Sequence, residues 1–282
     1  MTTSVADRRA ADEPVLQLDG VNVRFGGVHA LQDVDLTVYR AEVLGLIGPN
    51  GAGKTTLFDV ISGVRAPDQG RIRFLGDEVT NRSSIHRARR GLRRTFQRVQ
   101  TFGWLSVEDN VLAALEWRGG GGGMFADILR LPGRRRRERE RRERVLEVLG
   151  QCGLTAVRSD PVASLPIGLA RMVELARAIV DPPRLLLLDE PTSGLDEREA
   201  KRLIERLQQL RESSECSVIL VEHDMGFVME QCDTVVVLEV GRVIAMGTPS
   251  EIQNDPRVRA AYLGGGPDPQ ALSKNTNQGG NS

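Results

Sequence analysis

The most chemically specific stretch of this sequence is a glycine-rich segment at residues 48–55, GPNGAGKT, with the spacing Gly, four residues, Gly-Lys-Thr. Its glycines let the backbone curl until N–H groups point at phosphate oxygens, and a helix beginning there adds a positive end. Lys54 would reach the β- and γ-phosphates of a nucleotide, and the Thr55 hydroxyl would bind Mg²⁺. The expected ligand-holding residues are Gly48, Pro49, Asn50, Gly51, Ala52, Gly53, Lys54, Thr55 and Thr56.

A second candidate lies at residues 185–190, LLLLDE, where an apolar run ends in two acids. In open α/β sheets the carboxyl ends of parallel strands lie beside the phosphate-binding loop. Asp189 is therefore expected to hold a magnesium-bound water, and Glu190 to orient the water that attacks the γ-phosphate. The alternative is a strand that ends in charges because it reaches solvent, and the nearby loop motif counts against it.

The elements that must position these residues follow from apolar periodicity. Alternation over residues 15–39 predicts antiparallel strands with one solvated face, and three apolar runs predict buried strands of a parallel sheet flanked by helices. Those runs are 42–48, 184–190 and 217–223. Helical segments are expected at 54–62, 84–95, 107–116, 134–149, 168–180 and 197–212, with strand character at 70–80, a hairpin at 234–248 and short helices at 249–264.

Composition limits the class of protein. With 282 residues and 40% hydrophobic content, a globular protein is expected, and 38 basic against 38 acidic residues give no overall attraction to nucleic acid. Cys152, Cys216 and Cys232 are too widely spaced for a zinc site or disulfide framework, which suits a reducing cytoplasm. No secretory signal is evident, and no apolar run approaches the roughly 20 residues that span a bilayer.

Several segments have composition unlike a folded core. Residues 1–14 are expected to form a flexible lead, five glycines at 119–123 a break, and residues 264–282 a disordered tail. The eight arginines of residues 134–149 suggest either nucleic-acid binding or a solvated helix face ending at Gly150. Interleaved glutamates and the absence of aromatics favour the solvated face.

Three motifs in order identify a family resemblance. GPNGAGKTT at 48–56, LLLLDEPTSGLD at 185–196 and VILVEHD at 218–224 together resemble the ATP-binding subunit of ABC transporters, over residues 15–263. The resemblance implies an α/β fold: a P-loop NTPase core with a mostly parallel sheet, an antiparallel β subdomain and an α-helical signature subdomain at about 97–180. It also implies ATP and Mg²⁺ as ligands.

The resemblance assigns roles to further residues. Gln97 resembles the glutamine that bridges magnesium or water and the permease contact, with a surface glutamine as the alternative. His223 resembles the switch histidine that touches the γ-phosphate, and Asp196 the loop that crosses to a second subunit. Phe25 lies where the family stacks an aromatic on adenine, with a core phenylalanine as the alternative; His29 and His86 match no motif. The implied catalytic set is Glu190, His223 and Lys54, and the implied magnesium set is Thr55, Gln97 and Asp189.

The segment SLPIGLARMVELARA, residues 164–178, departs from the family pattern. The usual signature, Leu-Ser-Gly-Gly-Gln, aligns with Leu165, Pro166, Ile167, Gly168 and Leu169, so only Leu165 and Gly168 agree. Proline is favoured at the first position of a helix, and the backbone amides behind it can still bind an anion. Glu174 and Arg177 keep the family's spacing. The segment is therefore interpreted as a weakened but working contact to the ATP of a partner subunit.

Motifs outside the hydrolytic set resemble one branch of the family. RTFQ, VEDNVLAAL, EHDMGFVM and GTPSEIQNDPRVRAAYLG are similar to ATPases of branched-chain amino acid uptake, and the span from Gln97 to Leu165 resembles the larger of their two paired ATPases. This implies permease subunits, a second identical or paired ATP-binding subunit, a solute-binding protein, no nucleic acid, and a peripheral place on the cytoplasmic face of the plasma membrane.

Other functions stay open at this point. Urea, short amides or another small polar solute are alternatives to branched-chain amino acids, and lipopolysaccharide-type export is another. A soluble ABC ATPase acting on nucleic acid or ribosomes is also weighed. Such proteins usually carry two ATPase halves or a long coiled coil, whereas this sequence has one phosphate loop and neither addition.

Overall fold

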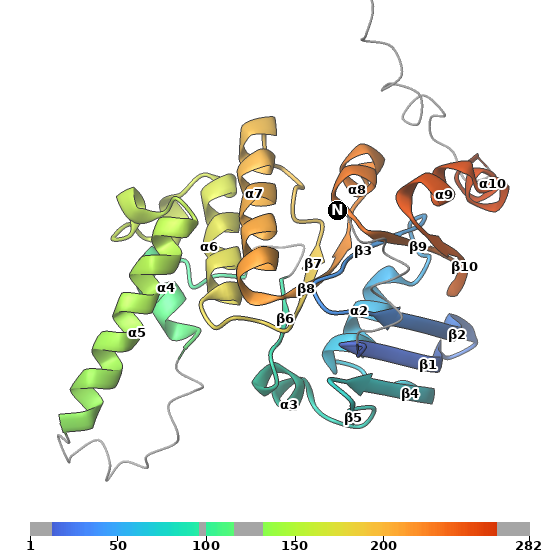
Figure 1. Ribbon diagram of the computed structural model, residues 1–282, viewed down its shortest axis with the longest axis horizontal. Helices are drawn as coiled ribbons and strands as arrows, with labels where there is room; N and C mark the ends of the chain where they lie inside the picture. Colours follow the sequence, from blue (N-terminus) through green and yellow to red (C-terminus); the bar gives the residue numbers. More distant parts are fainter. Residues whose placement is uncertain (1–12, 96–99, 116–131, 264–282) are drawn as a thin grey trace, which may run out of the picture. The chain divides into compact units, whose positions relative to one another are not determined.

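The computed structural model describes residues 13–95, 100–115 and 132–263 (Figure 1). The chain divides into two compact units. The sheet unit comprises Met1–Arg94, Arg184–Pro191 and Glu215–Ser282, and the helical unit comprises Thr95–Pro183 and Thr192–Ser214. The predicted lead up to residue 12, Gln97, the glycines at 119–123 and the predicted tail lie outside the described residues.

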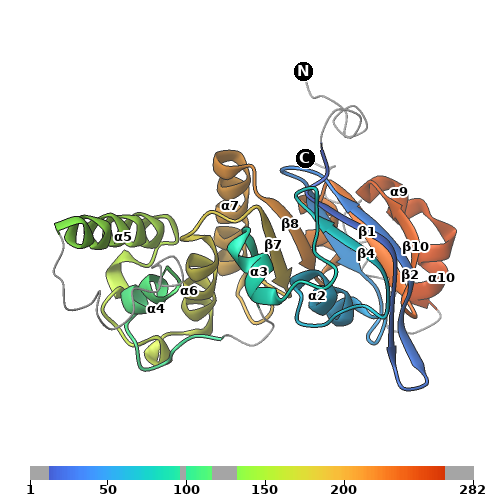
Figure 2. The same ribbon diagram turned by 90° about the horizontal axis from the view of Figure 1, so that it is seen from below.

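The first sheet of the sheet unit is antiparallel, with the order β2-β1-β4-β5. Its strands are β1 (Leu16–Phe25), β2 (Val28–Val38), β4 (Gln69–Phe74) and β5 (Asp77–Glu78). β2, β1 and β4 lie side by side (Figure 2). Buried and more exposed positions alternate along β1, as the period of two in its sequence predicts.

The second sheet has the order β10-β9-β3-β8-β7-β6. Its strands are β3 (Val43–Ile47), β6 (Leu92–Arg94), β7 (Leu185–Asp189), β8 (Ser217–Val221), β9 (Thr234–Glu239) and β10 (Arg242–Gly247). β6, β7, β8, β3 and β9 pair in parallel, and β10 adds antiparallel to β9. The predicted α/β fold with a mostly parallel sheet and an antiparallel β part is confirmed.

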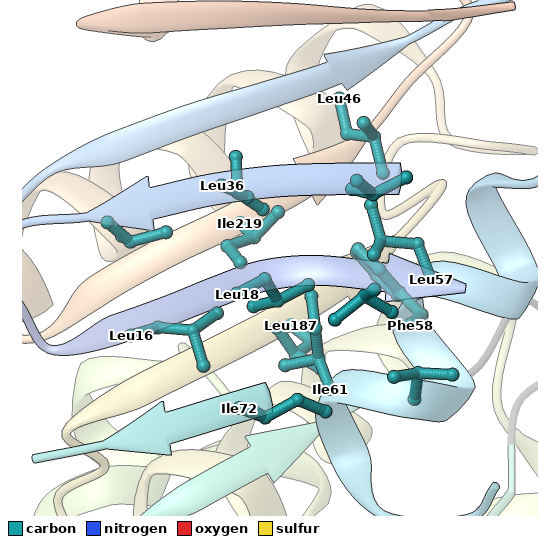
Figure 3. Close-up of a cluster of buried hydrophobic side chains, with 14 of the residues drawn as sticks. Leu16, Leu18, Leu36, Leu46, Leu57, Phe58, Ile61, Ile72, Leu187 and Ile219 are labelled. Carbon is teal, nitrogen blue, oxygen red and sulfur yellow. The ribbon is translucent and has the colours of Figure 1, made fainter. Parts of the chain in front are cut away.

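Helix α2 (Lys54–Ser62) anchors the phosphate-loop region in the core. Its buried side chains Leu57, Phe58 and Ile61 belong to one cluster with side chains from both sheets (Figure 3). The labelled partners from the strands are Leu16, Leu18, Leu36, Leu46, Ile72, Leu187 and Ile219. Burial of such a cluster fixes the helix, and therefore also the loop that precedes it.

A buried arginine caps the carboxyl end of α2. Arg87 in α3 (Ser84–Arg89) has no exposed surface, and its guanidinium donates to the carbonyl oxygens of Val60 and Ile61 at 2.6 and 2.8 Å. A cation at the carboxyl end of a helix satisfies carbonyls that lack partners within the helix. Burial lowers the pKa of Arg87 to about 10.

The expected helix over residues 84–95 is wrong in its second half. α3 ends at Arg89, and residues 92–94 form strand β6 beside β7. Gly91 adopts φ 97, which a helix cannot continue through, and its carbonyl accepts from the N–H of Arg184 at 2.8 Å. Pairing with β7 and burial of Leu92 outweigh the helix propensity of the arginines. Helix α8 (Met225–Gln231), capped by Asp224, was also not predicted.

The hairpin predicted at 234–248 is confirmed by β9 and β10. The sheet unit ends with the predicted short helices, α9 (Pro249–Asn254) and α10 (Pro256–Leu263). Thr248 and Glu251 cap α9 reciprocally, each accepting from the other's backbone N–H.

The helical unit contains α4 (Val107–Ala113), α5 (Pro132–Gln151), α6 (Ile167–Ile179) and α7 (Glu197–Ser214). Each corresponds to a predicted helix, although α5 runs one residue past Gly150. Fully buried Asn110 fixes the segment before α4, because its side chain bonds both the N–H and the carbonyl of Phe102 at 2.9 Å.

The described arginines of α5 are largely exposed and pair with glutamates. Arg136 bonds Glu140 and Arg139 bonds Glu143, both at 2.9 Å and one turn apart. Such exposed pairs contribute little to stability but balance the charge of the helix. The arrangement supports the solvated face predicted for this helix. Among the described residues, no helix is both long and apolar enough to cross a bilayer.

Candidate active site

The predicted phosphate-binding loop joins the end of β3 to the start of α2. Gly48 and Gly53 adopt φ 151 and 108, conformations that favour glycine. A Cβ on Gly48 would lie 2.1 Å from the carbonyl oxygen of Leu238, and one on Gly53 would lie 2.5 Å from that of Ala30. The loop therefore tolerates no side chain at either place. Its curled backbone and the amino end of α2 fit a phosphate group.

The rest of the loop is held by backbone hydrogen bonds, one within the loop and one from Gly241. Ala52 is buried, its N–H donates to the carbonyl of Pro49 at 3.1 Å, and its own carbonyl accepts from Gly241 at 2.8 Å. Asn50 and Gly51 are exposed at the tip of the loop. Thr55 and Thr56 occupy the first turn of α2, with Thr55 exposed. The predicted phosphate-holding residues thus form a continuous turn that leads into the first turn of α2.

Lys54 lies across this turn with its side chain buried. Its Nζ donates to the carbonyl oxygens of Gly48 at 2.7 Å and Pro49 at 3.0 Å. Burial lowers the pKa of Lys54, while the nearby carboxylates of Glu190 and Asp189 act to raise it. A cation at this place has the chemistry to bind phosphate oxygens, as predicted for Lys54.

Asp189 is the last residue of β7 and lies at the same end of the sheet. Burial raises its pKa, Arg94 opposes that shift, Glu190 and Asp59 add to it, and Lys54 opposes it. Carboxylate and hydroxyl oxygens are the ligands that Mg²⁺ prefers, so Asp189 and Thr55 have suitable donor chemistry.

Glu190 and His223 are brought together by adjacent strands. Glu190 follows β7 and His223 follows β8 by two residues, and the Glu190 Oε1 lies 2.8 Å from His223 Nε2. The side chain of Glu190 is 16% exposed and that of His223 is 52% exposed. Glu190 also adopts φ 48, a strained conformation for a residue with a side chain, which its N–H bond to Val221 maintains. Such strain is common at functional sites.

Phe25, the expected adenine platform, is half-exposed at the end of β1. The guanidinium of Arg65 lies 3.9 Å over its ring and donates to the carbonyl of Arg24 at 2.9 Å. The alternative of a core phenylalanine is therefore wrong. The role of Phe25 toward adenine stays a prediction.

The signature segment begins α6 in the helical unit. Pro166, expected at the first helical position, is instead the N-cap with φ −55 and ψ 153, and the helix begins at Ile167. The extended ψ of the proline lets its carbonyl accept the first helical bond, from Ala170 at 3.0 Å. The first turn of the helix thus contains Ile167, Gly168 and Leu169, so their N–H groups lie at its amino end, as expected. Leu165 precedes the cap in extended conformation.

Glu199 is a functional candidate that sequence reasoning missed. A Cβ on Gly168 would lie 2.0 Å from the Oε1 of Glu199, so the carboxylate packs directly on the glycine. The other oxygen of Glu199 accepts from the N–H of Asp196 at 3.0 Å, and Asp196 accepts from the N–H of Glu199 at 2.8 Å. The spacing Asp-x-x-Glu before a helix is a capping-box pattern and could have indicated this pair.

Glu174 and Arg177, whose spacing follows the family, lie farther along α6. Glu174 is buried, and the guanidinium of Arg177 lies 5.2 Å from the ring of Phe102 and bonds the carbonyl of Gln100. Burial lowers the pKa of Arg177, and Glu174 opposes that shift.

Two family models match parts of the chain. The model of the ABC transporter family matches residues 31–193. A second model, described as a branched-chain amino acid ATP-binding cassette transporter, matches residues 242–268.

Similar curated proteins cover nearly the same length. The high-affinity branched-chain amino acid transport ATP-binding protein BraF of Pseudomonas aeruginosa is 38% identical over 89% of this chain and 98% of its own. LivG of Escherichia coli, with the same description, is 38% identical over 89% and 98%. The lipopolysaccharide export ATP-binding protein LptB of Haemophilus influenzae is 32% identical over 89% and 97%.

Solved structures also match. The ATP-binding cassette MJ1267 of an ABC transporter, in its ADP conformation, superposes with a TM-score of 0.76 at 26% identity, over 89% of this chain and 99% of the other. The protein cbiO1 from Clostridium perfringens, part of the transporter complex cbiONQ, superposes with a TM-score of 0.73 at 30% identity, over 89% and 96%.

Proposed function

The chain belongs to the ABC transporter family of ATP-binding proteins, and we propose that it powers a membrane permease that imports branched-chain amino acids. BraF and LivG, both described for that transport, are 38% identical to it over almost their full length. The match at residues 242–268 is to the same branch. LptB is less similar, at 32% identity, so export is the weaker alternative, together with uptake of urea or short amides.

The observation that carries the hydrolytic assignment is the 2.8 Å contact between Glu190 and His223. A carboxylate at the end of one parallel strand and an imidazole after the next form an acid–base pair on the same sheet edge as Lys54 and Asp189. In the proposed mechanism, Glu190 accepts a hydrogen bond from the attacking water. His223 Nε2 leaves Glu190 to donate to the γ-phosphate.

The other residues of the sheet unit hold the nucleotide. Lys54 exchanges its loop carbonyls for phosphate oxygens, and the loop amides bind the β-phosphate. Thr55, Asp189 and Gln97 would hold Mg²⁺, and Phe25 would stack on adenine. Mg²⁺, when bound, offsets the negative charge that develops during phosphoryl transfer.

The helical unit supplies the contact to a second ATP-binding subunit. In the proposed dimer, two ATP molecules lie between the subunits, each facing one phosphate loop and the other subunit's signature segment. The amides of Ile167, Gly168 and Leu169 form a positive helix end that suits a γ-phosphate. Asp196, whose N–H donates to the Glu199 carboxylate that packs on Gly168, would cross to the same partner.

Exposed aromatic residues favour a further protein partner. Trp104 is 79% exposed and Phe102 is 41% exposed, with ring centroids 5.9 Å apart, a few residues after Gln97 in the sequence. Exposed aromatic pairs are typical of protein interfaces. We assign this pair to permease subunits, with a solute-binding protein across the membrane and this chain peripheral on the cytoplasmic face.

Reconstitution with the permease encoded beside it tests the proposal. Leucine, isoleucine or valine with the matching binding protein should stimulate ATP hydrolysis severalfold, and Glu190→Gln should abolish the stimulation. If urea, an amide or a lipopolysaccharide precursor stimulated hydrolysis instead, that compound and not a branched-chain amino acid would be the transported solute. Tight, salt-sensitive binding to RNA or DNA that activates the ATPase would replace the transport function altogether.

A further inference from the structure

Arg94, the last residue of β6, is a buried cation that none of the assigned roles uses. Its side chain is 7% exposed. Nη1 donates to the Oδ1 of Asp59 at 2.6 Å and to the hydroxyl of Ser62 at 3.3 Å, while Nη2 lies 3.7 Å from the Oδ2 of Asp189. The guanidinium carbon lies 5.6 Å from the ring centroid of Phe58.

These contacts join three elements through one planar group. Asp59 and Ser62 belong to α2, which begins at the phosphate loop, and Asp189 ends β7. The two nitrogens face carboxylates on different elements in the fixed geometry of a planar guanidinium, whereas a lysine would have to serve both carboxylates from one freely rotating nitrogen. Arg94 therefore fixes the position of the Asp189 carboxylate relative to α2.

The negative charges around Asp189 explain why its carboxylate needs a partner that fixes its position. Asp189 interacts unfavourably with two other acids, Asp59 and Glu190, and its side chain is only 12% exposed. Without a nearby cation, like-charge repulsion and poor solvation would turn the Asp189 carboxylate away from its neighbours. Lys54 is engaged with the loop carbonyls, so Arg94 is the cation with a fork directed at both Asp59 and Asp189.

We infer that Arg94 is a positioning residue that orients Asp189 for magnesium, holding the end of β7 against the phosphate-loop helix. This inference rests on the proposed role of Asp189 in binding Mg²⁺. Partners that orient a metal-ligating group typically change metal affinity by about 10- to 100-fold when they are lost. Arg94 acts through Asp189 and does not itself touch the nucleotide or the metal.

The test compares Arg94→Met with Arg93→Met. Arg93 is the neighbouring arginine of the same strand, and its guanidinium donates to the backbone carbonyls of Ala88 and Leu92. Mn²⁺ binding in the presence of a non-hydrolysable ATP analogue is followed by electron paramagnetic resonance, and analogue binding is also measured in EDTA. We expect Arg94→Met to weaken Mn²⁺ binding about 10-fold. Metal-free nucleotide affinity should change by less than about threefold, and Arg93→Met should alter neither affinity.

Two further variants separate orientation from folding. Arg94→Lys keeps the charge but loses the fork, so metal binding should remain weakened. If Arg94→Met alone does not fold, the double variant Arg94→Met with Asp59→Asn removes the stranded carboxylate. That double variant should fold while retaining the metal defect. Normal Mn²⁺ affinity in a folded Arg94 variant would overturn the inference.

The variant Asp189→Asn distinguishes a failure of the positioning role of Arg94 from a failure of the proposed magnesium site. If Asp189→Asn loses metal affinity and Arg94→Met does not, only the positioning role of Arg94 is wrong. If Asp189→Asn binds Mn²⁺ normally, the assignment of Asp189 itself fails, and the role of Arg94 fails with it.

Discussion

The two units carry their candidate contacts to ATP in different ways. In the sheet unit, ionisable side chains follow parallel strands, and Glu190 reaches His223 over 2.8 Å. In the helical unit, the first turn of α6 is formed by Ile167, Gly168 and Leu169, which have no ionisable side chain. In the proposed mechanism the first region depends on particular functional groups, and the second on backbone N–H groups that every residue except proline possesses.

This difference explains which parts of the family pattern the chain retains. In the proposed mechanism water activation needs the carboxylate of Glu190, and backbone groups cannot replace it. An anion site made of amides persists when its side chains change, which fits the loss of the usual serine and glutamine at 166 and 169. Gly168 is the exception, since the carboxylate of Glu199 occupies the space beside it.

The largest effect is expected in the sheet unit, at Glu190. Glu190→Gln keeps the shape of the residue and removes its ability to accept a proton, so turnover should fall by about 10²- to 10⁴-fold. ATP affinity should change little, because the variant leaves the loop backbone and the Lys54 side chain intact. Steady-state ATPase rates and equilibrium ATP binding check the two parts, with Glu230→Gln, at an exposed position of α8, as the control. Near-normal turnover would remove Glu190 from this role.

Much of this contrast was accessible from sequence, because both regions depend on local patterns. Lys54 and Asp189 belong to contiguous motifs whose spacing predicts the backbone around them. The structure places Lys54 at the start of a helix and Asp189 at the end of a strand, as those motifs predict. β3, α2, β7 and β8 likewise follow from uninterrupted apolar or amphipathic runs. Gln97 lies outside the described residues, so its role stays a prediction.

Long-range partners were not accessible in the same way. Arg87 and Arg94 lie in one arginine-rich run, and nothing local indicates that both are buried while others are exposed. Their partners, carbonyls of α2 and the carboxylates of Asp59 and Asp189, are set by tertiary packing. The same applies to β6, which exists only because β7 lies beside it.

An intermediate effect is expected at Gly168, the position where the helical unit depends on one residue type. Gly168→Ala should displace the Glu199 carboxylate from the N–H of Asp196, and loss of such a cap costs about 1 kcal/mol of stability. If glycine is needed to accommodate Glu199, the double variant Gly168→Ala with Glu199→Ala should match Glu199→Ala alone in melting temperature and ATPase rate. Leu169→Ala, one residue on, is the control.

The double-mutant comparison can also contradict this interpretation. Additive losses in the double variant would mean that Glu199 is not the reason for the glycine. The requirement at Gly168 would then lie with the nucleotide of the partner subunit, and the helical unit would depend on residue type at that contact as strictly as the sheet unit does.

The smallest effect is expected from restoring the family residues. Pro166→Ser with Leu169→Gln should maintain the ATPase rate or raise it by no more than about tenfold, roughly the value of one additional hydrogen bond. Serine is also a better N-cap than proline, so stability should rise slightly whatever happens at the nucleotide. Pro166→Asp separates the two effects. Aspartate caps the helix equally well but places a negative charge where a γ-phosphate would bind, so it should raise the melting temperature and lower the ATPase rate. An inactive native chain that becomes active only when Pro166→Ser and Leu169→Gln are both introduced would show that backbone amides alone are not sufficient there.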